Sequence, residues 1–502
     1  MRKIVSLLLI MLFVMGGAVM AQSDGSTLIV ARATDATGLD PHTQTAFASL
    51  RLLELIYEPL ILTDQELNLQ PGLAESWEFS EDGLTLTFAL RQGVTFHDGS
   101  DFTSEDVIAS FERILNEETG SAARSNYLSI ASMEAPDDYT VVFTLSQPDV
   151  PLLSALASTN AVILSSDVIA NEDPSLVTVG TGPFQLVSWT PDEVTQLAAN
   201  ENWWGEGPNV DNVEIRIIPD EASILAALRA ETIDFALLND PLVATLLLGD
   251  ENITLRRTPT LSYYVLQLRS VVEPLDSLEV RQAIACAVDR QQVIDTAALG
   301  EGRVTGPLTM ASFALPTDEL FCYQQDVERA RELMAAAGME DGFTLSVMAA
   351  TGEPPVAVSV AQNLQAQLEA INIQVEIDIV ELSTFVDRWL AGDFDAAVAL
   401  NGGRLDPYTM YARYWQNEAQ FQNTAGYIDE TLDDLMKRGQ VETDPDARYE
   451  IFAEFQRHLA ETSPWVWLYN GFTYTAHQNY VVGWEPNASD SLYFLAYVGV
   501  EK

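Results

Sequence analysis

The sequence predicts an α/β protein with more than one domain. Its 502 residues are enough for several hydrophobic cores. Residues 344–349 are strand-like, residues 356–370 have helical spacing and residues 373–380 are again strand-like, which is the order of a βαβ unit. No low-complexity linker separates the segments. We therefore expect lobes that share strands and between which the chain crosses more than once.

The first residues predict a secretory signal peptide. Residues 1–3 are cationic, residues 4–14 are apolar, and small residues end the segment at Ala21. The apolar run is short for a membrane span, although a retained signal anchor is the alternative. We expect cleavage after about Ala21 and secretion to the periplasm or the cell surface. No lipobox cysteine follows the apolar run, so we expect no lipid tether.

The charge of the chain limits its partners. The formal net charge is −49 at pH 7, and such a chain repels phosphate backbones and anionic lipid surfaces within a Debye length. We therefore expect no nucleic-acid partner. On net charge alone, a cationic or neutral ligand suits the protein better than an anionic one.

The two cysteines of the chain are Cys286 and Cys322. Export permits a disulfide between them, which would stabilise the protein by about 3 to 4 kcal/mol. The sequence leaves the pairing open because it contains no distance between the two residues.

The first part of the chain alternates strand and helix patterns and then becomes β-rich. Residues 27–33 are strand-like, and apolar residues recur with helical spacing over residues 47–57. Asp82-Gly83 separates residues 77–79 from the alternating residues 84–90, which is a strong hairpin signal.

His97 stands beside several acids, which raises the question of a metal or catalytic site. His97-Asp98-Gly99 has the composition of a turn. Thr103 and Asp106 fit the N-cap and N3 positions of a capping box that begins a helix. A structural role therefore accounts for this stretch better than chemistry does.

The rest of the chain continues the mixture of strands and helices. We expect further strands at 140–145, 185–189, 213–218 and 466–469, and further helices at 221–230, 276–296, 326–337 and 449–461.

A series of motifs occurs in the order found in one known family. They are Leu39-Asp40-Pro41, Tyr57-Glu58-Pro59-Leu60, the stretch 71–77, Phe96-His97-Asp98-Gly99, Ser104-Glu105-Asp106-Val107, Gly180-Thr181-Gly182-Pro183-Phe184, Asn202-Trp203-Trp204, the stretch 280–284 and Asp406-Pro407. Over nearly the whole mature chain the sequence resembles the extracellular solute-binding proteins of bacterial ABC importers, of the peptide, nickel and opine type (family 5).

This resemblance implies a two-lobed periplasmic-binding-protein-like fold of type II with an extra β-rich domain in the first lobe. Domain I would comprise residues 22–56, 186–265 and 480–502, domain II residues 57–185, and domain III, the second lobe, residues 266–479. The lobes would close on a small ligand by hinge motion and deliver it to permease subunits in the membrane. The resemblance implies a monomer without cofactor, metal or catalytic residues.

The resemblance and the strand ends together indicate candidate ligand-binding residues: Asp40, His42, Phe47, Tyr263, Tyr264, Arg404, Asp406, Tyr408 and Trp415. The loop from Asp40 to Phe47 leaves a strand end, a common place for ligand contacts, although Asp40 fixing the turn is an equal alternative. Alternation along a strand sends Tyr263 and Tyr264 to opposite faces, so at most one should face a ligand.

The loop from Asn401 to Tyr408 is the most informative. Peptide-binding members of the family commonly place an aspartate just before this acid and proline to hold the ammonium group of the ligand. Residues 401–403 provide no acid here, whereas Arg404 provides a planar guanidinium suited to a carboxylate or phosphate. Asp406 either replaces the missing acid or caps the following turn. Tyr408 and Trp415 either stack on the ligand or pack in a core.

Two other functions stay open on the sequence. A sensor or a chaperone of the same fold would have the same motifs. An exported hydrolase is the enzyme alternative, but the chain has no Gly-x-Ser-x-Gly, His-Glu-x-x-His or phosphate-loop motif, and we expect no enzyme. The sequence does not identify the ligand.

Overall fold

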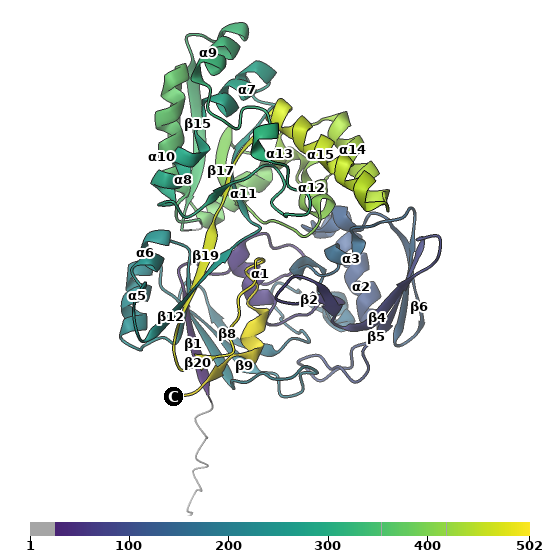
Figure 1. Cartoon of the computed structure of the whole chain (residues 1–502). Helices are drawn as coiled ribbons and strands as arrows, with labels where there is room; N and C mark the ends of the chain where they lie inside the picture. Colours follow the sequence, from purple (N-terminus) through teal and green to yellow (C-terminus); the bar gives the residue numbers. More distant parts are fainter. Residues whose placement is uncertain (1–25, 353, 418) are drawn as a thin grey trace, which may run out of the picture.

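Three main β-sheets organise residues 26–352, 354–417 and 419–502, which are the residues that the computed structural model describes. A seven-stranded and a four-stranded sheet lie in the lower part of Figure 1, which we call lobe 1. A six-stranded sheet lies above them in lobe 2. The predicted signal peptide, residues 1–21, lies outside the described residues. Within those residues, every helix is too short or too polar to span a bilayer.

The strands of lobe 1 form two large sheets. In spatial order the seven-stranded sheet contains β12 (Ile253–Pro259), β19 (Phe472–Gln478), β11 (Phe235–Leu238), β1 (Thr27–Arg32), β10 (Asn212–Ile217), β9 (Val194–Ala199) and β8 (Phe184–Thr190). The four-stranded sheet contains β4 (Ala74–Phe79), β5 (Thr85–Leu90), β7 (Thr140–Leu145) and β6 (Ile130–Asp137). Two short pairs complete the set, β2 (Ile61–Thr63) with β3 (Leu69–Pro71) and β20 (Val481–Val482) with β21 (Gly499–Val500).

Lobe 2 is built on the third sheet. Its order is β14 (Arg303–Val304), β18 (Trp465–Asn470), β13 (Tyr263–Leu268), β17 (Ala396–Asn401), β15 (Phe343–Thr351) and β16 (Ile373–Glu381). The helices of lobe 1 are α1 (Phe47–Leu53), α2 (Ser104–Leu115), α3 (Leu152–Ala155), α4 (Ser166–Asn171), α5 (Glu221–Arg229) and α6 (Pro241–Thr245). Those of lobe 2 are α7 (Leu278–Ala287), α8 (Arg290–Ala297), α9 (Val327–Ala336), α10 (Ala357–Leu368), α11 (Leu382–Ala391), α12 (Pro407–Trp415), α13 (Gln422–Ala425), α14 (Glu430–Val441) and α15 (Pro445–Thr462).

The central strands of the two largest sheets are buried on both faces. In β1, Leu28 and Val30 pack in one core and Ala31 packs in another, as alternation along a strand requires. In β13, Tyr263 packs against residues of α12 and α15, whereas Tyr264 packs with residues of α7 and α10. The mixed α/β class that the sequence predicts is confirmed, and the two tyrosines point to opposite faces as expected.

Several predicted elements are present with changed ends. Residues 343–381 form the predicted βαβ unit, because β15 and β16 are parallel and α10 connects them. β4 and β5 form the predicted hairpin, with Gly83 at a φ of +68° in the turn. The helix predicted for 276–296 is two helices instead. Asp289 accepts a hydrogen bond from Gln292 N–H and starts α8, while Val288 is extended.

Two short segments carry the chain between the large sheets of the lobes. β12 ends at Pro259 and β13 begins at Tyr263, and later β18 ends at Asn470 and β19 begins at Phe472. Thr260 N–H donates to Gly471 O at 3.4 Å, so the two crossings lie side by side. β19 pairs with β11 and β12 in lobe 1. We therefore propose lobe boundaries at about residues 260 and 471. The sequence predicted boundaries at 265 and 479.

Cys286 and Cys322 form a disulfide, which resolves the state that the sequence left open. Their Cα atoms are 4.7 Å apart, and the bond joins the end of α7 to the loop before α9. A closed loop of this length stabilises the folded chain by about 3 to 4 kcal/mol, mainly by restricting the unfolded state.

The buried carboxylate of Glu58 connects four distant segments of lobe 1. It accepts hydrogen bonds from Thr181 Oγ1 at 3.0 Å, Trp203 Nε1 at 3.0 Å, Trp204 Nε1 at 2.7 Å and Tyr493 Oη at 2.9 Å. Burial raises the pKa of Glu58 to about 7, and the four donors oppose that rise. Three of the motifs that carried the family resemblance therefore meet at one carboxylate.

The stretch around His97 is structural. His97 Nε2 lies 3.0 Å from Gly182 O, and Gly180 N–H donates to His97 Nδ1 at 3.3 Å, so the ring holds two loops of lobe 1 together. The carboxylate of Asp106 accepts a hydrogen bond from Thr103 N–H at 2.9 Å at the start of α2, as in the predicted capping box.

Candidate ligand-binding site

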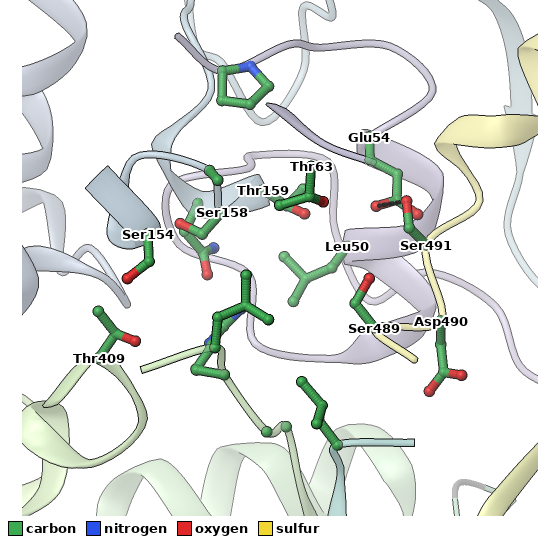
Figure 2. A pocket seen from close by; sticks show the side chains of 18 of the residues that line it. Leu50, Glu54, Thr63, Ser154, Ser158, Thr159, Thr409, Ser489, Asp490 and Ser491 are labelled. Atoms are coloured by element: carbon green, nitrogen blue, oxygen red, sulfur yellow. Dashed lines mark hydrogen bonds between the residues drawn. The ribbon is translucent and has the colours of Figure 1, made fainter. Parts of the chain in front are cut away.

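A cavity of about 180 Å³ lies between the two lobes. Figure 2 shows its wall, to which lobe 1 contributes Leu50 of α1 and Glu54, the residue that follows this helix. The lobe 1 side also includes residues 154–155 at the end of α3, residues 157–160 after it, and residues 488–491, 493 and 494 near the C-terminus. Lobe 2 contributes residues 402–405 together with Thr409 and Arg413 of α12. A site enclosed in this way suits a small solute that both lobes contact.

Side chains with hydrogen-bonding groups make up much of the wall. Figure 2 shows hydroxyl groups of Ser154, Ser158, Thr159, Ser489 and Ser491 around the cavity. The buried polar atoms of the lining that have no hydrogen-bond partner among the described residues include Asn126 Oδ1 and Arg413 Nε. Buried polar atoms are nearly always paired in native proteins, so these two atoms are candidates for contacts with a ligand.

Two arginines give the cavity a local positive charge. Among the described residues, neither Arg404 nor Arg413 forms an ion pair with an acid. Burial lowers the pKa of Arg404 to about 10, and the nearby charge of Arg413 acts in the same direction. Arg413 lies 4.9 Å above the ring of Tyr414. Guanidinium groups without an acid partner match the geometry of a carboxylate or phosphate, so these two are candidates for contacts with an anionic group.

The acids of the wall already have partners. Asp490 lies 3.4 Å from Arg51 and accepts a hydrogen bond from Thr473 Oγ1 at 2.5 Å. Glu54 accepts a hydrogen bond from Ser491 Oγ at 3.0 Å, and burial raises the pKa of Glu54 to about 7. The local charge therefore favours an anionic group on the ligand. This differs from the expectation drawn from the net charge, because contacts inside a cavity outweigh a surface charge that salt screens.

The predicted loop from Asp40 to Phe47 contributes only part of itself to the cavity. Phe47 lines it, as does Thr45. Asp40 instead accepts two hydrogen bonds from Arg113, at 3.0 and 2.5 Å. His42 Nε2 lies 3.0 Å from Val162 O, and its ring is fully buried. Asp40 and His42 thus fix the loop and do not line the cavity.

The other predicted residues divide in the same way. Arg404 lines the cavity, whereas Asp406 accepts a hydrogen bond from Tyr408 N–H at the start of α12 and pairs with Arg448 at 2.7 Å. The capping role of Asp406 is therefore the one observed. Four aromatic candidates lie outside the wall of the main cavity: Tyr263, Tyr264, Tyr408 and Trp415.

Sequence reasoning missed Arg413. Thr409 and Arg413 are four residues apart on α12 and line the cavity from one face of that helix. Asp406 as N-cap followed by Pro407 is a helix-start signal that could have revealed this spacing. The sequence interpretation treated the same residues as a turn.

On the side of α3, lobe 1 contacts lobe 2 through one glutamine of α14. Gln440 Nε2 donates to Asp149 Oδ2 at 3.0 Å, and Gln440 Oε1 accepts from Gln147 Nε2 at 2.8 Å. Its backbone oxygen accepts from Val150 N–H at 2.9 Å. These contacts hold the lobes together around the cavity.

Comparison with known proteins gives consistent results. Residues 68–422 match the family described as bacterial extracellular solute-binding proteins, family 5 Middle. The dipeptide-binding protein of Escherichia coli K12 is 28% identical over 424 residues, which cover 78% of this chain and 79% of that protein. The glutathione-binding protein GsiB of Salmonella paratyphi A is 27% identical over 481 residues, 91% of each chain.

Among solved structures, the periplasmic binding protein AgaA of A. tumefaciens R10 in complex with agropinic acid is similar throughout. Its TM-score is 0.89 at 28% identity, and the superposition covers 95% of this chain and 99% of AgaA. The likeness therefore extends over both lobes and includes the region of the cavity.

Proposed function

The chain belongs to family 5 of the bacterial extracellular solute-binding proteins, and we propose that the solute it captures is a small molecule with a carboxylate. Proteins of this family are periplasmic solute-binding components of ABC importers, and this chain has that function. It binds a small solute and works with the permease subunits of the importer. Proteins of this family bind solutes and are not enzymes.

The observation that carries the proposal is the pair Arg404 and Arg413. A guanidinium presents two parallel N–H groups that match the two oxygens of a carboxylate. Since neither arginine has an acid partner among the described residues, a carboxylate of the solute would supply the missing charge. Asn126 and the hydroxyl groups of the wall would bind other polar atoms of the solute.

The ligands of the relatives agree with this chemistry. The similar proteins are named for a dipeptide and for glutathione, and AgaA was solved with agropinic acid. All three kinds of molecule carry a carboxylate. The sequence identities to these three proteins are all 27 to 28% and therefore favour none of the three ligands. The proposal rests on the carboxylate that the ligands share.

The test begins with native mass spectrometry of the protein as purified, to detect a retained solute. Thermal unfolding is then compared for dipeptides, glutathione and opines and for the same molecules with each carboxylate converted to an amide. A carboxylate ligand at 100 times its Kd stabilises the protein by about 2.7 kcal/mol and raises the melting temperature, whereas its amide does not. Equal shifts with acids and amides would refute a carboxylate requirement.

We also propose that residues 1–21 direct export and that the protein acts as a monomer without a nucleic-acid partner. The net charge of −49 supports the last point. A sensor or chaperone of the same fold is the alternative to import. Co-purification of the protein with a permease favours import over that alternative.

Asp149 gives closure of the lobes a predicted pH dependence. Burial raises the pKa of Asp149 to about 6, and the charge of Asp406 adds to this while Arg448 opposes it. When the lobes open, we expect water to reach Asp149, and the loss of burial, which is the largest cause of the raised pKa, lowers it towards 3.8. Loss of the Gln440 hydrogen bond acts in the other direction but is the smaller effect. The closed form thus binds the proton more tightly, so closure is favoured below pH 6 and this contribution is lost as the pH rises through 6.

We expect the equilibrium constant for closure to be about tenfold larger at pH 5 than at pH 7 in the wild type. Small-angle X-ray scattering at the two pH values measures the fraction of closed protein. In Asp149→Asn this dependence is lost, because the amide does not titrate. A variant that keeps the full wild-type pH dependence would show that another group causes it.

A further inference from the structure

A second cavity of about 90 Å³ adjoins the first on the side of lobe 2. The two cavities share Thr45, Phe47, Gly402 and Arg413 in their walls. Arg413 is therefore common to both, and a carboxylate bound there has its neighbouring carbon atoms at the entrance of the second cavity. A Cβ atom on Gly402 would lie 3.3 Å from the ring of Phe47, so glycine allows the ring to stand close to this boundary.

One wall of the second cavity is the apolar face of a helix. Leu382, Phe385, Val386 and Trp389 lie on one face of α11, at positions i, i+3, i+4 and i+7, and all four line it. Trp389 is buried and fixed by a hydrogen bond from its Nε1 to Gln267 Oε1 at 2.7 Å. The other three are only half-buried. An apolar helix face that borders an unfilled space gains stability when an apolar group covers it.

The size of the second cavity limits that group. An apolar protein cavity of about 150 Å³ holds benzene. A cavity of about 90 Å³ is smaller than this and suits a branched aliphatic group of the size of a leucine side chain. Among its lining residues, Thr45, Asn401, Arg413 and Tyr414 carry polar side-chain atoms, and Trp389 carries one that is already bonded to Gln267. The other lining side chains are apolar, which favours an apolar arm.

We propose that one solute occupies both cavities, with its carboxylate on Arg404 and Arg413 and a branched aliphatic arm against α11. This inference rests on the proposed function and narrows it to an amphipathic carboxylate whose arm branches a few bonds from the acid group. The main cavity selects the anion, and the second cavity selects the shape and polarity of the arm. Phe47 stands between the two and contacts both parts of the solute.

The experiment on the wild type uses three probes and isothermal titration calorimetry at millimolar concentrations. N-acetyl-L-leucine has the acid and the arm, N-acetylglycine has the acid alone, and N-acetyl-L-leucinamide has the arm without the acid. For the wild type we expect N-acetyl-L-leucine to bind about 10- to 100-fold more tightly than N-acetylglycine, which corresponds to burial of one aliphatic side chain. The amide is expected to bind at least tenfold more weakly than the acid.

Two variants of α11 test the second cavity in opposite directions. Val386→Trp fills it, and we expect the preference for the leucine probe over the glycine probe to fall to about one. Phe385→Ala enlarges it, and we expect the preferred probe to change from N-acetyl-L-leucine to N-acetyl-L-phenylalanine. Leu390→Trp is the matched control, because Leu390 is exposed on the same helix and lies outside both linings. It should keep the wild-type preference.

The outcomes separate this inference from the proposed function. Two results would contradict binding of the arm in the second cavity and leave the carboxylate site intact. One is equal affinity of the wild type for N-acetyl-L-leucine and N-acetylglycine. The other is an unchanged preference in both Val386→Trp and Phe385→Ala. Equal binding of N-acetyl-L-leucine and its amide would overturn the carboxylate site. If none of the probes binds at millimolar concentration, both are overturned.

Discussion

Replacing Arg404 by alanine is expected to weaken binding of a carboxylate solute by about 10- to 100-fold. A charge-assisted hydrogen bond to a buried guanidinium contributes about 1.5 to 3 kcal/mol, and the variant removes one of the two guanidinium groups of the cavity that lack an acid partner among the described residues. Titration calorimetry with the solute found by mass spectrometry measures the loss.

The same variant should not lower the stability of the ligand-free protein. Arg404 has no acid partner among the described residues, it is desolvated, and Arg413 lies near enough to lower its pKa further. Removing it relieves this repulsion, so we expect an equal or higher melting temperature together with the weaker binding. A parallel loss of both properties would mean that Arg404 supports the fold instead of the ligand.

His97→Ala is the control for this experiment. His97 joins two loops of lobe 1 and lies outside the cavity lining. Its loss should lower the melting temperature and leave ligand affinity unchanged. If Arg404→Ala binds as the wild type does, Arg404 is not in the site. A large loss of affinity in His97→Ala would place the stretch around residue 97 in the site after all.

Glu58→Ala is expected to lower the free energy of unfolding by about 3 to 5 kcal/mol. The variant leaves two indole N–H groups and two hydroxyl groups without their acceptor inside the protein, and unsatisfied buried donors are costly. Urea unfolding followed by tryptophan fluorescence measures the change, since Trp203 and Trp204 contact the carboxylate.

Glu78→Ala is the matched control, because Glu78 is an exposed residue of β4. A surface change of this kind stays within about 0.5 kcal/mol. Glu58→Gln should fall between the two, since an amide offers one acceptor oxygen but adds two donors of its own. Similar urea midpoints for Glu58→Ala and Glu78→Ala would show that the four hydrogen bonds contribute little to stability.

Local patterns were predictable where the determinants lie close together in the sequence. The βαβ unit and the Asp82-Gly83 hairpin follow from periodicity and turn composition within short windows. The division between α7 and α8 was missed because Asp289 competes with the apolar spacing as a helix start, and a continuous pattern hides such a cap.

Site residues were harder because their partners are distant in sequence. Asp40 and His42 lie at the predicted strand end. Both of them hydrogen-bond to Arg113, which is 73 and 71 residues further along the chain. Nothing near Asp40 in the sequence indicates that partner. Arg404 was predicted as a ligand-binding residue because residues 401–403 contain no acid. Arg413 lies on a helix whose other residues are all buried, and nothing near it in the sequence indicates that it reaches the same cavity as Arg404.

The position of the two crossings between the lobes determines where movement is largest. Segments 260–262 and Gly471 lie together, and Figure 1 shows β19 on the opposite side of the molecule from α3 and α14. In a rotation of the lobes about these crossings, residues near the hinge hardly move, whereas residues far from it are displaced the most. The surface near Gln147 and Gln440 lies far from the hinge. Two fluorescent labels placed there, one on each lobe, would therefore report solute binding through the largest change in their distance. The fold thus already contains the layout of a biosensor for its own solute.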